Sequence, residues 1–306
     1  MTPQTILITG ATSGIGRDAA LRLAELGHRV IATGRRPAAL TTLAEEARGA
    51  GLSLDTVRVD VNDQATIDAA VAEVDALTGG HGVDVLVNNA GFGLIGPVTE
   101  MSDADVRAQF DTNVFGLLAV TRAFVPKMRS RRSGRILNVT SGAGRAAFPF
   151  FGPYAATKFA VEALSDALRY ELGGFGIDVV LIEPGMTRTG FADHALSKVA
   201  GYGGEGAPYR DVLARVDAMT ARSDRMSVDP EVITKAIVRA IDARRPAARY
   251  MAPFRMKLTI AALRLLPTPL VDLAMRKVFG LDAKSLRDAP TPTAPSESAA
   301  PQRASA

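Results

Sequence analysis

The chain has no cysteine in its 306 residues, which excludes disulfide bonds, thiolate catalysis and cysteine-ligated zinc. Histidine is also scarce, because only His28, His81 and His194 are present and they lie far apart in the sequence. A cluster of metal-binding side chains is therefore not expected, and the sequence predicts no metal site.

Long apolar runs are missing as well. Arg264, Pro267, Pro269 and Asp272 interrupt the most hydrophobic C-terminal stretch, so no run reaches the roughly 20 residues of a membrane span. The first ten residues carry neither the charged region nor the cleavage site of a signal peptide. From these two absences we expect a cytoplasmic protein.

Neither sign of charge dominates. The chain holds 36 Lys and Arg against 32 Asp and Glu, a formal net charge of +4, and the basic residues are spread along it. This distribution predicts no nucleic-acid partner. The hydrophobic share of 47% is enough to fill the core of one large α/β domain.

Short apolar stretches alternate with helical ones. The expected strands cover residues 5–9, 29–33, 54–59, 83–88, 135–140 and 177–183, with a last short one at 249–251. A helix from Ser102 past Asn113 to Met128 begins with a capping-box-like signal, and another runs from Asp229-Pro230 to about Ala243. Such alternation predicts an α/β doubly wound parallel sheet, Rossmann-like, in a single domain with a helical C-terminal extension.

The expected catalytic domain covers residues 1–251 and includes a glycine-rich substrate lid at 186–228. The extension at 252–287 holds two apolar helices at 256–266 and 269–279, the second capped by Thr268 and ended by Gly280. These helices can close a pocket, form a subunit contact or lie weakly on a membrane surface, since basic residues flank them. The Pro-, Ala- and Ser-rich tail at 288–306 is expected to be disordered.

A glycine turn follows the first expected strand. Gly10, Gly14 and Gly16 have the spacing G-x-x-x-G-x-G, and a helix comes directly after them. Without side chains, the backbone N–H groups and the helix N-terminus can approach a pyrophosphate. This arrangement indicates a dinucleotide site.

The end of the second expected strand indicates which dinucleotide. NAD enzymes commonly keep an acidic residue there, but this chain has Arg35 and Arg36 after Gly34. Two guanidinium groups suit a 2′-phosphate, so NADP(H) is favoured over NAD. The alternative is that both arginines are ordinary surface charges.

Tyr154 and Lys158 share one face of an expected helix that Gly152-Pro153 opens. A nearby ammonium group favours the phenolate, so Lys158 is expected to lower the pKa of Tyr154 towards neutrality. A tyrosine of this kind can serve as an acid or base for a carbonyl group.

In this order, the motifs resemble those of the short-chain dehydrogenase/reductase family, over roughly residues 4–251. The resemblance implies four catalytic residues, Asn113, Ser141, Tyr154 and Lys158. Ser141 would bind the substrate oxygen, Tyr154 would exchange its proton, and Asn113 would bind a water that relays protons to Lys158, which would also hold the nicotinamide ribose. The remaining cofactor contacts that it implies are Gly10, Thr12, Ser13, Ile15, Gly16, Asp60, Val61, Asn89, Ala90, Gly91, Pro184, Gly185 and Thr187.

The implied reaction is hydride transfer between NADP(H) and a carbonyl or alcohol, usually in a dimer or tetramer. Phe148, Phe150 and Phe151 precede Tyr154 and suggest a hydrophobic substrate such as a steroid, retinoid or lipid-like compound, unless they belong to the core or to a subunit contact. Two alternatives stay open: a 3-ketoacyl thioester reductase, and a catalytically silent NADP-binding regulatory protein.

Overall fold

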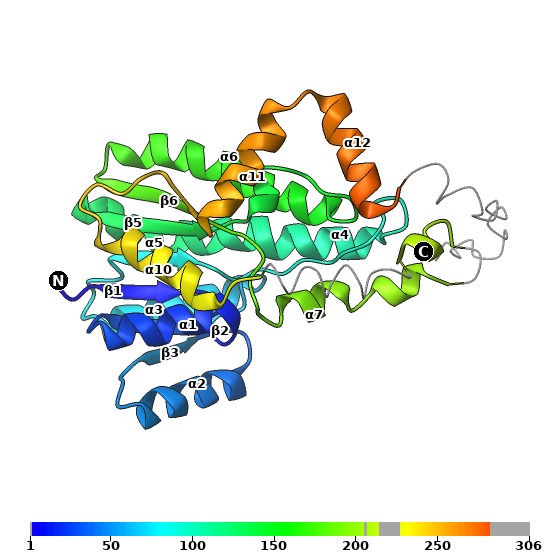
Figure 1. The fold of residues 1–306 in the computed structure, drawn as a ribbon. Coiled ribbons are helices and arrows are strands. Elements are labelled where there is room, and N and C mark those ends of the chain that lie inside the picture. Colours follow the sequence, from blue (N-terminus) through cyan, green and yellow to red (C-terminus); the bar gives the residue numbers. More distant parts are fainter. Residues whose placement is uncertain (1, 205–206, 214–226, 282–306) are drawn as a thin grey trace, which may run out of the picture.

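The computed structural model describes residues 2–204, 207–213 and 227–281 (Figure 1). The expected tail at 288–306 lies outside these residues, as do positions 205–206 and 214–226 of the expected lid.

Seven parallel strands form one sheet in the order β3-β2-β1-β4-β5-β6-β7. The order runs outwards in both directions from the β1–β4 pair, which confirms the doubly wound parallel sheet. The strands are β1 (Thr5–Ile8), β2 (Arg29–Gly34), β3 (Asp55–Arg58), β4 (Val85–Asn88), β5 (Gly134–Val139), β6 (Ile177–Pro184) and β7 (Arg249–Ala252).

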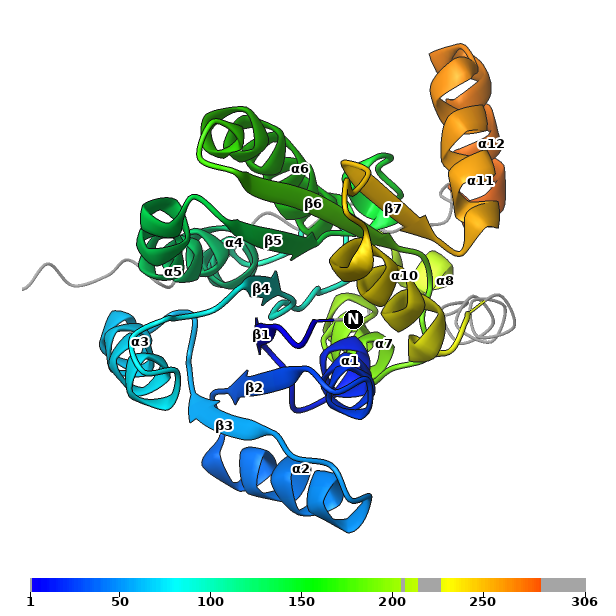
Figure 2. The same cartoon turned by 90° about the vertical axis from the view of Figure 1, so that its left-hand side faces the viewer.

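Helices cover both faces of the sheet (Figure 2). One face packs against α1 (Gly14–Glu25) and α10 (Pro230–Asp242), and the other against α3 (Gln64–Leu77), α5 (Leu117–Arg131) and α6 (Gly152–Gly173). Successive β1 side chains divide between these cores, since Ile6 and Ile8 face one and Leu7 the other. This two-sided burial explains why the strands are continuously apolar.

The expected helix from 102 to 128 is present, but it is not a regular α-helix throughout. Ser102 does cap α4 (Asp103–Phe110), where its Oγ accepts from the Asp105 N–H at 3.1 Å. One stretch of π-helix, η1 (Asp111–Gly116), then separates α4 from α5. Hydrophobic periodicity does not report such a wide turn, because the side-chain pattern changes by only one residue.

The remaining helices are α2 (Pro37–Gly49), the short α7 (Phe191–Leu196) and α8 (Arg210–Leu213), and the C-terminal pair α11 (Phe254–Leu265) and α12 (Thr268–Phe279). The predicted cap of α12 was wrong: Pro267 precedes the helix in an extended conformation, and Thr268 is already its first residue. Gly280 ends α12 in the left-handed region with φ of 66°, as expected.

Candidate active site

The expected site segments meet at one edge of the sheet. Gly10, Asn89, Ser141 and Gly185 follow closely on β1, β4, β5 and β6, and the carboxyl ends of parallel strands share an edge. The β1–β4 pair is the point where the strand order reverses, which is the usual position of a ligand in open α/β sheets.

The glycine turn is held by the segment after β4. Gly10 adopts φ of +64°, and a Cβ there would lie 2.9 Å from Ala90 Cα. Asn89 Nδ2 donates to Thr9 O at 3.0 Å and Gly10 O at 3.2 Å, and a methyl group on Gly16 would overlap both Gly10 O and that amide. Close contacts within the protein therefore require the glycines at 10 and 16.

The N-terminus of α1 suits an anion. Ser13 precedes the helix and makes no side-chain capping bond, and the first turn contains no acidic residue. Thr12 packs against the end of β2, because a Cβ on Gly34 would lie 2.8 Å from the Thr12 methyl group. Ile15 points into the core on the α1 side of the sheet. The uncapped helix end fits the phosphates of a dinucleotide.

Arg35 and Arg36 are both exposed, directly after β2. Arg36 precedes α2, and Pro37 begins that helix. Within the part of the chain that the structure describes, no salt bridge joins either guanidinium group to a carboxylate. Both groups fit an additional phosphate near the adenosine end of a dinucleotide.

Asp60 and Val61 follow β3 on the same edge. The Asp60 carboxylate accepts from the Asn62 N–H at 3.1 Å, and Val61 packs on η1, because a Cβ on Gly116 would be 2.8 Å from Val61 Cγ2. On the other side of the site, Thr187 Oγ1 donates to Gly185 O at 3.0 Å in the turn that follows Pro184. Both segments border the region that a nucleotide would occupy.

Tyr154 lies in the first turn of α6 and is 8% exposed. Its phenol lies beside Ser141, whose Oγ accepts from the Ala143 N–H at 3.1 Å. Burial raises the pKa of Tyr154 to about 12, although Ser141 acts in the opposite direction. Gly93 allows this packing, since a Cβ there would be 2.8 Å from Tyr154 Cδ2.

Lys158 is buried one helical turn after Tyr154. Its Nζ donates to Val139 O at 3.0 Å and lies 5.8 Å from the centroid of the Tyr154 ring. Burial lowers the pKa of Lys158 to about 8, against the attraction of the Glu162 carboxylate. The sequence predicts that Lys158 lowers the pKa of Tyr154. In the structure this pKa is raised instead, because burial of the phenol outweighs the other influences.

Asn113 lies within η1 and has little hydrogen-bonding capacity left. Its Oδ1 accepts from the Phe92 N–H at 2.9 Å, while Nδ2 donates to Phe92 O at 2.7 Å and Thr157 Oγ1 at 3.0 Å. A Cβ on Gly91 would lie 2.9 Å from Asn113 Oδ1 and 3.6 Å from Lys158 Nζ. Both side-chain amide hydrogens of Asn113 already donate hydrogen bonds within the protein. Asn113 can therefore bind the expected relay water only as an acceptor, through an oxygen.

A buried charge cluster behind Lys158 was not anticipated from the sequence. Glu162 and Glu183 are 6% and 2% exposed and share two arginines: Arg145 Nη1 lies 3.2 Å from Glu183, and Arg249 Nε lies 3.1 Å from Glu162. Burial and the negative charge of Glu162 raise the pKa of Glu183 to about 7. One signal was available, because Tyr154, Lys158 and Glu162 repeat every fourth residue of α6.

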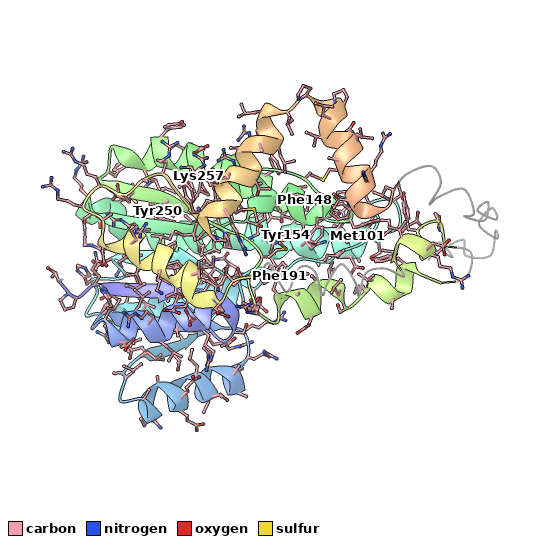
Figure 3. All side chains as sticks on the ribbon, viewed as in Figure 1. Met101, Phe148, Tyr154, Phe191, Tyr250 and Lys257 are labelled. Carbon is pink, nitrogen blue, oxygen red and sulfur yellow. The ribbon has the colours of Figure 1, made fainter. Side chains whose placement is uncertain are left out.

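The three phenylalanines before Tyr154 have different surroundings. Phe150 is buried in a separate apolar cluster, where its ring lies 6.4 Å from that of Phe279. Phe151 packs in the cluster that contains Tyr154, as does Phe191, whose ring lies 5.4 Å from the phenol ring. Figure 3 labels Tyr154 between Phe148 and Phe191. Phe150 is therefore a packing residue, and Phe151 and Phe191 adjoin the phenol.

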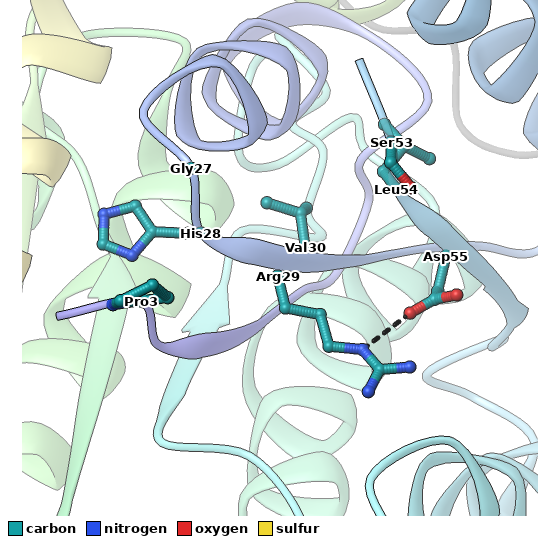
Figure 4. A pocket seen from close by; sticks show the side chains of 8 residues that line it. All are labelled: Pro3, Gly27, His28, Arg29, Val30, Ser53, Leu54 and Asp55. Carbon is teal, nitrogen blue, oxygen red and sulfur yellow. Dashed lines mark hydrogen bonds and ion pairs between the residues drawn. The ribbon is translucent and has the colours of Figure 1, made fainter.

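A separate open pocket of about 400 Å³ lies at the opposite edge of the sheet (Figure 4). It is formed where β2 and β3 begin, and the ion pair of Arg29 and Asp55 at 3.0 Å crosses its floor. Neither the glycine turn nor Tyr154 contributes to it. This pocket is separate from the candidate active site.

Residues 2–204, 207–213 and 227–281 contain no helix that is long and apolar enough to cross a membrane. They also contain no group of three or more His, Cys, Asp or Glu side chains that could hold a metal ion.

Comparisons with known proteins agree on one family. The family model described as short chain dehydrogenase matches residues 4–200. The chain is 33% identical to a 3-ketodihydrosphingosine reductase of Bacteroides thetaiotaomicron, over 92% of this chain and 100% of that protein. It is 30% identical to an NADPH-dependent 3-dehydrocapnine reductase of Ornithobacterium rhinotracheale (92% and 97%). It is 38% identical to mouse 17-beta-hydroxysteroid dehydrogenase type 1 (86% and 77%).

These matches and the sheet order agree with each other. The chain therefore belongs to the short-chain dehydrogenase family of oxidoreductases, which act on CH–OH and C=O groups with a nicotinamide cofactor.

Proposed function

We propose that the protein is an NADP(H)-dependent oxidoreductase that transfers hydride between the nicotinamide and the carbonyl or alcohol group of a hydrophobic, lipid-like substrate. The observation that carries the proposal is the buried Tyr154 phenol beside Ser141, with Lys158 one turn away and its Nζ 5.8 Å from the centroid of the phenol ring. This arrangement provides a proton donor and a second hydrogen-bonding group for one substrate oxygen.

The phenol is the acid in the reductive direction. With its pKa raised to about 12, Tyr154 is protonated at neutral pH and can give its proton to the substrate oxygen. The Ser141 hydroxyl donates a hydrogen bond to the same oxygen as negative charge develops on it. The cofactor supplies the hydride that reduces the carbonyl carbon. Lys158, whose Nζ lies 5.8 Å from the centroid of the phenol ring, is the proposed source of the proton that returns to the phenolate, and Asn113 is the proposed link to solvent.

The exposed pair Arg35 and Arg36 supports NADP(H) as the cofactor. A 2′-phosphate placed at the end of β2 would meet two guanidinium groups and no carboxylate, an arrangement that favours a doubly charged group. The Ornithobacterium relative is named as an NADPH-dependent enzyme, which agrees with this assignment. The glycine turn, Asp60, Val61, Asn89 to Gly91 and the turn at Pro184 to Thr187 would hold the rest of the cofactor.

The substrate class rests on the surroundings of Tyr154. Phe151, Phe191 and Ala143 contribute apolar surface beside the phenol, which favours a substrate with an extended hydrocarbon part. Two relatives are named for 3-ketodihydrosphingosine and 3-dehydrocapnine, and a third for a hydroxysteroid. We favour a long-chain ketone of the first kind and keep steroids and retinoids as test substrates.

The two alternatives predict different results from one experiment. Purified protein is given NADPH or NADH together with 3-ketodihydrosphingosine, a steroid ketone, retinal, an aliphatic ketone or a 3-ketoacyl thioester, and cofactor oxidation is followed by absorbance. Fastest turnover with NADPH and the long-chain ketone supports the proposal. Preference for the thioester favours the ketoacyl reductase, and NADPH binding without turnover of any compound favours the silent regulatory protein.

Substitutions of Arg35 and Arg36 test the cofactor assignment. Arg35→Asp should weaken the preference for NADPH over NADH by roughly tenfold or more, because it removes a phosphate partner and supplies an acceptor for ribose hydroxyls. Arg48→Asp, on α2, is a matched control whose preference should stay unchanged. An unchanged preference in Arg35→Asp and in Arg36→Asp would reject the assignment of this pair.

A further inference from the structure

The C-terminal hairpin, α11 plus α12, exposes an unusual amount of apolar surface. The exposed fractions include 68% for Phe254, 84% for Leu265 and 66% for Leu273, and α12 has no buried residue. Figures 1 and 2 both show the hairpin standing away from the sheet and its covering helices. Packing within the described part of the chain therefore does not explain why these side chains are apolar.

The exposed apolar residues of α11 form a stripe. Phe254, Leu258 and Leu265 are separated by four and seven residues, spacings that return to one side of a helix with about 3.6 residues per turn. Ile260, on another side of the helix, is 3% exposed and packs inwards. The two sides of α11 thus differ, because Ile260 packs inwards while the stripe is left uncovered by residues 2–204, 207–213 and 227–281.

Exposed apolar residues also occur along α12. Leu270, Leu273 and Val278 are 54%, 66% and 62% exposed. They are spread around the helix, and Val271 and Met275 are half-buried beside them. Both helices of the hairpin therefore expose apolar side chains, as helices that lie in a membrane interface do.

The net charge of the hairpin indicates what kind of surface it binds. Residues 253–280 contain five basic side chains and one acidic one, a net charge of +4 that equals the net charge of the whole chain. Lys257 and Arg264 lie beside the α11 stripe, and Arg276 and Lys277 lie near the end of α12. A second copy of the hairpin would repel this charge, whereas an anionic lipid surface attracts it.

The hairpin also touches the segments that border the catalytic residues. Met256 of α11 packs beside Gly142, where a Cβ would lie 3.3 Å from its Cγ, and beside Gly185, where a Cβ would lie 3.0 Å from its Cε. At the other end, Phe279 meets Phe150, four residues before Tyr154. A surface that binds the hairpin would therefore lie close to the segments that carry Ser141 and Tyr154.

We propose that the exposed apolar residues of α11 and α12 dock the protein on an anionic lipid surface, from which a lipid-like substrate reaches Tyr154. The docking itself rests only on the hairpin, and the delivery of substrate rests on the proposed function. Because the helices have twelve residues each, they lie in the interface and do not span the bilayer.

Flotation with vesicles tests the docking. The full chain is mixed with phosphatidylcholine vesicles that contain either no anionic lipid or a third of phosphatidylglycerol, and the floating fraction gives the partition coefficient. We expect binding to the anionic vesicles. Leu265→Glu combined with Leu273→Glu should lower the coefficient at least tenfold, and Lys257→Gln combined with Arg264→Gln should lower it roughly thirtyfold, at about one kcal/mol per charge.

The matched control is Tyr170→Glu, which changes a 73% exposed ring on α6 and should leave flotation unchanged. Absence of the full chain from the floating fraction, or equal binding of the wild type and both hairpin variants, would overturn the docking. So would a dimer that dissociates in the leucine variant without any flotation, because a second copy would then be the partner.

Turnover separates the docking from the proposed function. The leucine variant should keep the wild-type rate on a short, water-soluble ketone and lose at least tenfold on the long-chain ketone presented in anionic vesicles. Equal losses on both ketones would overturn delivery from the membrane. Flotation by a protein that reduces no ketone would reject the proposed function and leave the docking in place.

Discussion

The environment of the Tyr154 phenol differs from what its neighbours in sequence predict. The spacing to Lys158 correctly predicts that the two side chains lie close together, but pairwise attraction favours the phenolate while burial favours the neutral phenol. Burial is the larger influence, so the pKa rises to about 12. Sequence spacing cannot give this result, because burial depends on Gly93 and Phe191, which come from other segments.

Removing the phenol hydroxyl tests its role directly. Tyr154→Phe should lower kcat for ketone reduction by about 10²- to 10⁴-fold, because the proton donor is lost. Ser141→Ala should cost about 10²- to 10³-fold, as expected for one lost hydrogen bond to a developing charge. Steady-state kinetics measure both, with Tyr170→Phe as the control. Wild-type kcat in Tyr154→Phe would show that another group supplies the proton.

Lys158 should make the protein less stable at neutral pH. Its pKa falls from 10.5 in the unfolded chain to about 8 in the folded protein, so the buried charge costs roughly 3 kcal/mol at pH 7 and about 1 kcal/mol at pH 10. The sign follows because, between these two pKa values, the unfolded state binds more protons and stability rises with pH.

Lys158→Met removes this cost together with the activity. In urea unfolding, the variant should exceed the wild type in free energy of unfolding at pH 7, and the difference should narrow by about 2 kcal/mol at pH 10. A gap that stays constant between these pH values would contradict the lowered pKa of Lys158.

At the scale of elements, the sequence predicts the strands well and the connections between them less well. Buried parallel strands are continuous apolar runs, and glycine and proline mark their ends, so each expected strand lies within two residues of the observed one. The π-helical stretch η1 could not be predicted, because Asn113 is held there by hydrogen bonds to Phe92, a residue on a distant loop.

The glycine turn shows a similar limit. The spacing predicts a close backbone approach, but in the protein the close neighbours of Gly16 are Gly10 O and Asn89. Gly16→Ala should lower the free energy of unfolding by about 1–3 kcal/mol, as overpacking does. Gly49→Ala, where a new Cβ meets nothing within 4 Å, should be neutral or stabilising by up to about 1 kcal/mol. Thermal and urea unfolding compare them, and equal stability of the two variants would contradict the tight contact.

The buried cluster of Glu162, Glu183, Arg145 and Arg249 joins α6, β6, β7 and the segment after β5. Glu183 holds a proton in the folded protein up to about pH 7, whereas the unfolded carboxyl loses it near pH 4.5. Between these values the folded state binds more protons, so its stability falls as pH rises.

Glu183→Gln should remove this fall in stability with rising pH, because the amide side chain stays neutral at every pH in the range. Unfolding free energies of the wild type and the variant, measured from pH 5 to pH 8, should diverge in favour of the variant as pH rises. Parallel pH profiles would mean that the arginines keep Glu183 ionised.

At the scale of the whole molecule, the order of motifs along the chain was sufficient to predict one doubly wound domain, because each βα unit places its loop at the same edge of the sheet. The position of the hairpin was not predictable. Apolar and basic residues at 256–279 are compatible with packing on the protein, and only the exposed fractions distinguish an outward apolar side from a buried one.

The net charge of the molecule is also unevenly placed. Residues 253–280 carry all of the excess positive charge, which leaves the sheet and its covering helices close to neutral. The net charge of the hairpin can therefore be changed by substitution while the net charge of the sheet and its covering helices, which hold the catalytic residues, stays the same.

The central claim is hydride transfer from NADPH to a lipid-like ketone with Tyr154 as proton donor. The most direct measurement uses NADPH deuterated at nicotinamide C4 with 3-ketodihydrosphingosine, and mass spectrometry of the alcohol that forms. We predict one deuterium at the former carbonyl carbon with the wild-type protein, and at most a hundredth of that product with Tyr154→Phe. An alcohol without deuterium, or equal labelled product from both proteins, would contradict the account.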